Sequence, residues 1–353
     1  MTTLPAIYVM TSRVSIDGQY NPGVSNNVNS AVVTECVDGL YACEIELLNH
    51  DALDYLYFDR REFDFGAKIA FAVGLGATNE TLFEGYITGL EARYLDGGGS
   101  RLTILAEDAL QNLRMTRRTR TFEDVSDEDV MNRIAEEHSL QTSFDDLSGP
   151  TYRVLAQTNL SDLAFLRQCA RRLNAELWIG GGRLHAARRA SRGAERVVLA
   201  YGANLRSFQV RADLAHQCTE FAVGGWDVQA KESIRETADD SSLSSELGGL
   251  QGGSAILQEA FGARVASLVH TMPLSTAEAR AVAAAEYQRK ARRFVVGSGT
   301  ADGDPRLRVG AILELSEVGP MFDGDYYIAR TNHRIDLDRG YTTDFEVERA
   351  GIG

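Results

Sequence analysis

Near both ends of the chain, hydrophobic and polar residues alternate with a period of two, which predicts strands with one buried and one wet face. Cys43, Ile45 and Leu47 point one way, while Glu44 and Glu46 point the other. A preceding apolar run reaches this strand through an Asp-Gly turn, as in an antiparallel hairpin. The N-terminal part of the chain is therefore predicted to form a closed antiparallel barrel or a sandwich.

One β pattern occurs twice, at 83–108 and again at 322–349. Each copy begins with an aromatic residue, an acid and a glycine, continues as a strand, turns through polar residues and returns as an alternating strand. Gly324 follows Gly85 by 239 residues (324 minus 85). Because a repeated supersecondary unit indicates a repeated architecture, we expect two related antiparallel β-barrels in one chain.

Helical patterns interrupt the strands. Ser126 precedes three acids and then apolar residues at helical spacing, and Ser161-Asp162 begins a second helix with one apolar stripe. The turn 180–182, three glycines, lies within a predicted hairpin, and a capping box begins an alanine-rich helix at 275–292. Residues 232–256 are rich in Ser, Glu and Gly, and we predict a loop or mobile segment there.

These patterns predict a mainly β protein with α+β insertions. The first barrel is expected at 1–115, and the second at 204–230 together with 296–353. An α+β unit at 116–203 is inserted between them. Residues 231–295 are expected to form a further insertion, with the polar loop and the alanine-rich helix.

Composition narrows the class of protein. A chain of 353 residues is too long to fold around a single hydrophobic core. Its composition, 44% hydrophobic and 24% charged residues, is typical of soluble globular chains. No apolar run is long enough to span a bilayer, and the N-terminus lacks the features of a secretory signal. The formal charge of −14 argues against a general nucleic-acid binder, which needs a basic face. The cysteines, expected to be buried small hydrophobes, are Cys36, Cys43, Cys169 and Cys218.

No motif predicts a catalytic residue, a cofactor or a metal. The six histidines include no pair at helical ligand spacing. Four arginines within 114–120 are interpreted as a solvated strand or an inter-subunit contact. One acidic cluster could supply paired carboxylates for glycoside cleavage, but acids around a first helical turn also have a capping explanation, which we favour. The members of this cluster are Glu123, Asp124, Asp127, Glu128 and Asp129.

Several segments resemble one family, the phage late control gene D proteins, which are central hub components of contractile tails and of phage-derived contractile injection systems. The most specific segment, 152–179, is similar to the family's SDxxFLxxLAxxxG helix followed by an aromatic strand and a Gly turn. The family usually has glycine where this chain has Asn174 or Ala175. Residues 122–140 resemble the preceding helix. The resemblance covers most of 30–350, including the closing barrel, and fails at the polar 232–256 stretch.

This resemblance implies two tail-tube-like β-barrels per chain and a structural, non-enzymatic role in the baseplate of a virion or injection particle. Family members assemble as trimers, so two barrels in each of three chains would give a six-fold-like ring. Such a ring would adapt a hexameric inner tube above to a trimeric spike below, surrounded by baseplate wedge proteins. Because the chain ends soon after the second barrel, we expect the spike to be a separate protein. We expect no membrane insertion and no sequence-specific nucleic-acid binding.

Two other classes of function stay open at this point. Residues 121–145 faintly resemble a wall-binding βαα module, which would suit a peptidoglycan-binding or cell-wall-degrading tail protein. A soluble β-rich hydrolase would instead need two carboxyl groups about 5–10 Å apart in a cleft.

Overall fold

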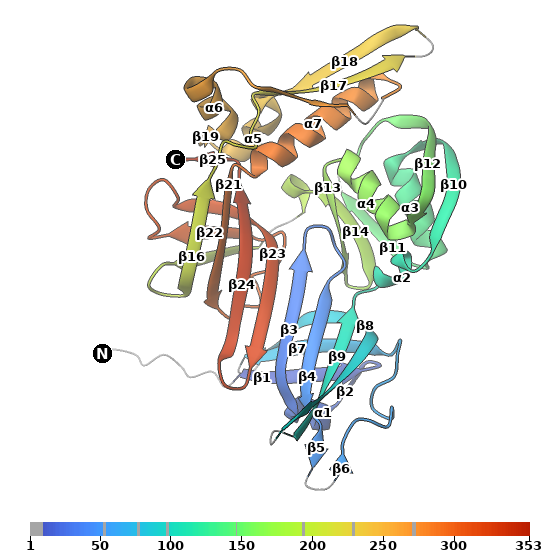
Figure 1. The fold of residues 1–353 in the computed structure, drawn as a ribbon, viewed down its shortest axis with the longest axis vertical. Helices are drawn as coiled ribbons and strands as arrows, with labels where there is room; N and C mark the ends of the chain where they lie inside the picture. Colours follow the sequence, from blue (N-terminus) through green and yellow to red (C-terminus); the bar gives the residue numbers. More distant parts are fainter. Residues whose placement is uncertain are drawn as a thin grey trace.

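The computed structural model describes residues 10–51, 54–75, 78–96, 99–145, 147–192, 195–227, 230–269 and 273–353. The first nine residues of the predicted first barrel lie outside this part of the chain. The mainly β class with α-containing insertions is confirmed, because one large sheet runs through both ends of the chain. Figure 1 shows the N-terminal strands in blue beside the C-terminal strands in red. Among the described residues, no helix is long and apolar enough to cross a membrane.

The first β unit has the strand order β3-β4-β9-β8-β7-β1, and every neighbouring pair is antiparallel. Its inward side chains, among them Val33, Ile45, Phe71 and Ile104, form one buried core. The strands are β1 (Met10–Ile16), β3 (Val28–Cys36), β4 (Ala42–Leu48), β7 (Lys68–Leu75), β8 (Thr78–Leu95) and β9 (Gly99–Glu107). Shorter elements are β2 (Gln19–Tyr20), α1 (Pro22–Asn26), β5 (His50–Asp51) and β6 (Asp54–Tyr55).

The second β unit has the order β16-β21-β24-β23-β22-β15. Its core includes Leu205, Val295, Leu313 and Ile328. The strands are β15 (Arg196–Ala200), β16 (Leu205–Ala212), β21 (Val295–Asp302), β22 (Ile312–Ser316), β23 (Gly324–Asp336) and β24 (Gly340–Arg349). Position by position, this order repeats that of the first unit, so the predicted duplication of the β pattern is confirmed by the strand order.

The residue pairs of the two hairpins show which residues of the two β units are equivalent, and they correct the alignment expected from the sequence. Tyr86 pairs with Glu107 and Tyr327 with Glu348, so Tyr327 is the equivalent of Tyr86 and Glu348 that of Glu107. A register shift follows at the next step of both hairpins. The alignment of Gly85 with Gly324 expected from the sequence was therefore wrong by two positions. One strand departs from the repeat, because β1 pairs antiparallel with β7 whereas β15 pairs parallel with β22.

The two β units are not separate sheets. β3 of the first unit pairs with β23 of the second, so the strands of both units lie in one continuous sheet (Figure 1). The sequence pattern predicted the units but not this joint between them.

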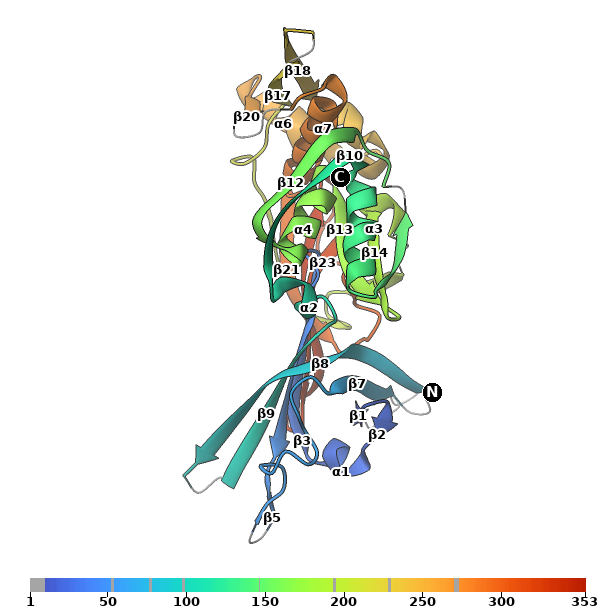
Figure 2. The same cartoon turned by 90° about the vertical axis from the view of Figure 1, so that its right-hand side faces the viewer.

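The inserted α+β unit lies between the two β units in sequence and has its own core. Figure 2 shows its helices α3 and α4, with the paired strands β10 and β12 beside them. Its elements are α2 (Gln111–Arg114), β10 (Arg117–Ser126), α3 (Asp127–Glu137), β11 (Gln141–Asp145), β12 (Thr151–Ser161), α4 (Asp162–Arg172), β13 (Ala175–Gly180), β14 (Arg183–Arg188) and η1 (Arg189–Ser191). β15, which falls within the predicted 116–203 unit, pairs instead with β22 of the second β unit.

Asn174 stands where the helix motif described in the sequence analysis usually has glycine. It follows the end of α4 with φ at +54°, in the left-handed region. Glycine adopts this conformation without steric cost, and asparagine is among the non-glycine residues that tolerate it best. Asn174 therefore allows the chain to turn at the end of α4.

A fourth unit is inserted between β16 and β21, with the alanine-rich helix packed on a three-stranded sheet. Its elements are β17 (Glu220–Asp227), β18 (Glu232–Ala238), η2 (Asp240–Leu243), α5 (Ser244–Leu247), β19 (Gln251–Gly252), α6 (Gly253–Phe261), β20 (Val265–Leu268) and α7 (Thr276–Arg292). β17 was expected in the second barrel and is instead the central strand of this small sheet. β19 pairs with the last strand, β25 (Gly351–Ile352).

The prediction of a loop or mobile segment at 232–256 was wrong. This stretch forms β18, η2, α5 and the start of α6. Among its apolar side chains, Ile234 and Leu243 are buried, and Glu246 forms an ion pair with Arg292 of α7. Low local hydrophobicity was misleading because the α7 helix supplies the apolar surface and the counter-charge.

Candidate subunit interface

The seam between β3 and β23 shows what a contact between two β units looks like in this protein. Its residue pairs run from Arg330 opposite Cys36 to Asp336 opposite Ser30. Side chains alternate between the two faces of the sheet. The buried face carries Ala31, Val33 and Glu35 of β3 with Thr331, His333 and Ile335 of β23.

Glu35 is the unexpected member of this buried face, with 1% of its surface exposed. Its carboxylate forms an ion pair with Arg308, and one oxygen accepts a hydrogen bond from the backbone N–H of Val309 at 3.1 Å. Arg308 also donates to the carbonyl oxygens of Thr81 and Leu82 in the first unit. The segment before β22 is thereby fixed to the first β unit by a charge that is partly shielded from water.

His333 lies beside this ion pair and is fully buried. Its Nδ1 atom is 2.7 Å from the Tyr341 hydroxyl and 3.2 Å from that of Thr343. Burial, and secondarily the nearby Arg308 charge, lowers the pKa of His333 to about 4, although Glu35 acts in the opposite direction. The imidazole is therefore neutral in the folded chain at neutral pH. On the opposite, more exposed face, the Thr34 hydroxyl donates to the side-chain oxygen of Asn332 at 2.8 Å.

Both β units leave one sheet edge open. β8 pairs with β7 only as far as Tyr86, and residues beyond Ile87 pair with β9 on one side alone. β16 pairs with β21 on one side, and apart from an isolated bridge between Leu205 and Tyr201 no described strand pairs with its other side. Each open edge carries apolar side chains, and Tyr94 of β8 has 66% of its surface exposed. A long edge with exposed apolar residues is a template for pairing with another strand.

The four arginines near residue 117 all find acceptors within the chain. Arg114 pairs with Glu107, and Arg117 donates to the Asn159 carbonyl. Arg118 and Arg120 both form ion pairs with Asp162 and Glu137. The contacts of Arg118 and Arg120 hold β10 against α3 and α4. Arg117 and Arg118 are exposed on their strand, as expected for a solvated strand, and the alternative of an inter-subunit contact stays a prediction.

Asp162, the first residue of α4, contacts Arg118, Arg120, His138 and Gln157. Burial alone would raise the pKa of its carboxyl, but hydrogen bonds from His138 and Gln157 and the charges of Arg120 and Arg118 outweigh it and lower that pKa. Of the other histidines, His185 stacks on Trp178. Within the described residues, no group of three potential ligands could hold a metal ion.

The acidic cluster of the α3 start is used in capping and packing. Ser126 and Asp129 form a reciprocal capping box, with hydrogen bonds of 3.1 and 2.9 Å. Asp127 is buried, accepting from Arg172 at 3.0 Å and from the Tyr152 hydroxyl at 3.0 Å. Glu123 is exposed. A paired glycosidase site at these carboxylates is not supported, because Asp127 is itself buried and already paired with Arg172.

Of the four cysteines, Cys43, Cys169 and Cys218 are buried and Cys36 is half-buried, and all four are free thiols. Burial raises the pKa of each of these thiols. They fit the predicted role of small hydrophobic side chains.

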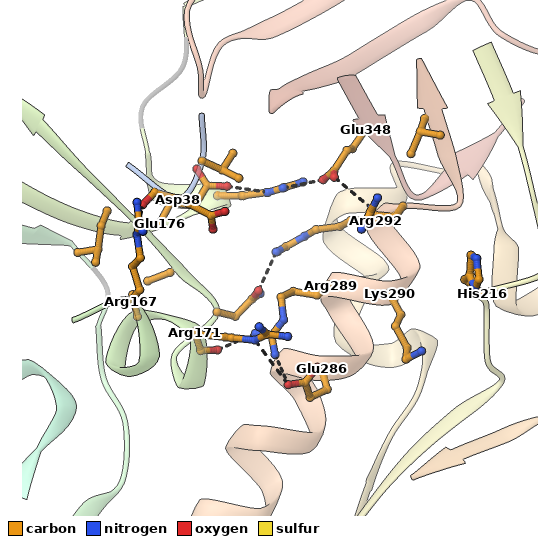
Figure 3. Close-up of a pocket in the computed structure, with 18 of the residues that line it drawn as sticks. Asp38, Arg167, Arg171, Glu176, His216, Glu286, Arg289, Lys290, Arg292 and Glu348 are labelled. Atoms are coloured by element: carbon orange, nitrogen blue, oxygen red, sulfur yellow. Dashed lines mark hydrogen bonds and ion pairs between the residues drawn. The ribbon is translucent and has the colours of Figure 1, made fainter. Parts of the chain in front are cut away.

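A cleft of about 890 Å³ lies where the α+β unit, α7 and the second β unit meet (Figure 3). Its carboxylates are shared among arginines: Glu286 contacts Arg289 and Arg171, and Glu348 contacts Arg189 and Arg293. Backbone contacts also cross it, since Arg289 donates to the carbonyl oxygen of Arg171 at 2.6 Å. We interpret this cleft as the joint between the inserted units, in which Glu286 and Glu348 are paired with arginines.

The fold is that of tail proteins in solved structures. The 43 kDa tail protein of prophage MuSo2 from Shewanella oneidensis has a TM-score of 0.72 and 15% identity, over 97% of this chain and 98% of that one. The tail protein of Neisseria meningitidis MC58 has a TM-score of 0.68 and 12% identity, over 98% of each chain. At these identities the likeness shows the fold alone.

A third similar structure is the E. coli c3393 protein, with a TM-score of 0.60 and 13% identity over 95% of this chain and 76% of that one. It is described as a component of the type VI secretion system with structural similarity to the T4 bacteriophage tail proteins gp27 and gp5.

The chain belongs to the family of Alg8 N-terminal domains, whose sequence model matches residues 6–336. No curated protein matches the chain. The resemblance to tail proteins expected from the sequence is thus supported at the level of fold, and the matching family is Alg8 rather than late control gene D.

The seam ion pair predicts a stability effect. Arg308→Met should lower the free energy of unfolding by about 3 kcal/mol, because Glu35 would keep a buried charge without its partner. Arg206→Met is the matched control, since its pair with Asp302 is about half exposed and should contribute less than about 1 kcal/mol. Denaturation by urea measures both. Equal losses in the two variants would contradict a special role for the seam pair.

His333 predicts a dependence of stability on pH. Its folded pKa of about 4 lies below the unfolded value of about 6.5. Above pH ~6.5 the imidazole is neutral in both states, but between pH ~6.5 and about 4 only the unfolded chain binds the proton. Relative to a His333→Asn variant, the wild type should therefore lose about 3 kcal/mol of stability across this window.

The measurement is the difference in unfolding free energy between wild type and His333→Asn at several pH values. A Tyr341→Phe variant is the control, because it removes a contact of the imidazole and keeps the titrating group. A constant difference from pH 7 to 4 would show that His333 does not stay neutral on folding.

If Asp127 is a structural residue, its replacement should lower stability, whereas a residue of a glycosidase site would cause a loss of activity when replaced. Asp127→Asn should lower the free energy of unfolding by about 3 kcal/mol, because Arg172 would lose its buried counter-charge. Glu123→Gln, at an exposed position, should change it by less than about 0.5 kcal/mol. Fluorescence of Trp178, which lies in the same unit, reports the transition. Glycan turnover that disappears in both variants would favour the hydrolase alternative.

Proposed function

We propose that this protein is a structural hub in the baseplate of a contractile tail or contractile injection system. In this role three chains form a ring of six similar β units, which adapts a hexameric inner tube to a trimeric spike. The chain acts without catalysis, cofactor or metal. Its partners are two further copies of itself, inner tube proteins above, a separate spike protein below and baseplate wedge proteins around.

The duplication carries this proposal. Two β units with the same strand order and the same hairpin register offer two similar docking surfaces per chain. A ring with three-fold symmetry then presents six such surfaces, which is what contact with a hexameric tube requires. A chain with one β unit would need six copies to do the same.

Three further observations support the assignment. The segment 152–179 resembles the late control gene D proteins, whose members are trimeric hubs. The fold is shared with tail proteins and with a type VI secretion component described as similar to gp27 and gp5. Of the acids that could serve a hydrolase, Asp129 caps α3 and the buried Asp127 pairs with Arg172.

Mass and symmetry test the proposal. Native mass spectrometry of the purified chain, alone and with its spike protein, should give a species of three times the 38.6 kDa chain mass. Electron microscopy of the particle should place a three-fold ring of six similar lobes at the end of the tube. A chain that stays monomeric in both preparations, or a particle with one or six copies, would overturn the proposal. Retention of the chain on purified peptidoglycan would favour the wall-binding alternative.

A further inference from the structure

The internal seam predicts how neighbouring copies meet, because the strands that form it have equivalents at the two open edges. The hairpin β8–β9 corresponds to β23–β24, with Tyr86 and Glu107 in the places of Tyr327 and Glu348. The second half of β23, which pairs with β3, therefore corresponds to the stretch 89–95 of β8. In the described chain this stretch has no partner on that side.

The equivalent of β3 is β16. Ala42 lies opposite Glu107, and Val296 lies opposite Glu348, so Ala42 and Val296 are equivalent. Thr34 of β3 pairs with Ala42, and Arg211 of β16 pairs with Val296. Arg211 of β16 is thus the equivalent of Thr34 in β3. Both strands also have a register shift at matching places, next to Val28 in β3 and next to Leu205 in β16.

We infer that the second half of β8 in one copy pairs antiparallel with β16 of the next copy, in the register of the seam between β23 and β3. This inference rests on the proposed ring and names its contact. Transferring the register places Glu91 opposite the neighbour's Arg211, since Asn332 is opposite Thr34. It also places Ala92 opposite Val210, and Tyr94 opposite Phe208.

The side chains fit this register on both faces. On the face that is buried in the internal seam, β8 offers Leu90, Ala92 and Tyr94, and β16 offers Phe208, Val210 and Ala212. All six are apolar, and none of the six is fully buried in the isolated chain. Burying such cross-strand pairs is the usual source of sheet stability.

The opposite face is polar, as it is in the internal seam. There the Thr34 hydroxyl donates to Asn332 across the strands. The transferred register replaces this hydrogen bond with an ion pair between Glu91 and Arg211 of the next copy. Both residues are exposed in the single chain, and the contact that Arg211 makes with Asp213 is loose, at 3.8 Å. A register shifted by one residue would instead place apolar residues opposite polar ones along the whole edge.

The two seams differ in their buried charge. Ala92 stands where β23 has His333, and Ala212 stands where β3 has Glu35. The buried ion pair and imidazole of the internal seam therefore have no counterpart between copies. The contact between chains is an apolar one, with a single ion pair on its exposed face.

Charge reversal tests the register. Glu91→Arg or Arg211→Glu alone should weaken association of the copies about tenfold or more, because each places like charges opposite each other at every contact between chains. The double variant, E91R with R211E, should restore association to within about threefold of the wild type. Glu84→Arg is the matched control, an exposed reversal on β8 outside the proposed pairing. Sedimentation equilibrium measures association, and circular dichroism shows whether each variant folds.

Cross-linking provides a second, independent readout. Ala92→Cys combined with Val210→Cys should give disulfide-linked copies under mild oxidation, while Ala92→Cys combined with Arg206→Cys should not. The register would be overturned, and the proposed ring would stand, if the wild type forms trimers but the double reversal does not restore association and the disulfide does not form. The absence of any oligomer in the wild type would overturn both.

Discussion

Backbone pairing between β3 and β23 is the constraint on which the rest of this structure depends. β22 covers only the first few residues of β23, and a strand whose remaining N–H and C=O groups were left open would lose stability. β3 covers that remainder and joins the two β units into one sheet. The same mismatch in length leaves the second half of β8 open, because β7 ends its pairing at Tyr86. One geometric feature of the repeated unit thus produces both the internal joint and the open edge.

The strands of the internal seam differ from their equivalents at the open edges in buried charge. Within the chain, the seam contains Glu35, Arg308 and His333, groups that are costly to bury unless each has a partner. At the open edges, alanines stand in the places of Glu35 and His333. This difference is physically reasonable, because a permanent joint forms during folding, whereas a contact between copies must exist first as an exposed surface. A charged or polar side chain at such a surface would have to lose its water when the copies meet, whereas an alanine does not carry this cost.

The two inserted units also contact each other through polar side chains. The α+β unit and the fourth unit each have their own core, and they meet across arginines and carboxylates rather than across an apolar interface. Contacts of this kind are more hydrated than a core, so the joint can adjust without exposing hydrophobic surface. The cleft between the units is therefore a joint at which ion pairs position the inserted units.

The sequence by itself determined the local features of this protein. Period-two alternation identified the strands of both β units, capping residues placed the starts of α3, α4 and α7, and the repeated pattern revealed the duplication. These signals depend on neighbours close by in the chain. Glu35 carried a further signal, a charge on the same strand face as Ala31 and Val33, which indicates a buried partner without identifying it.

The tertiary structure alone decided that this partner is Arg308, that the stretch 232–256 is ordered against α7, and that β3 lies beside β23. β3 and β23 lie near opposite ends of the chain. The physical reason is that pairing between strands so distant in sequence depends on which backbone edges remain open after local pairing, and no local pattern of side chains records that.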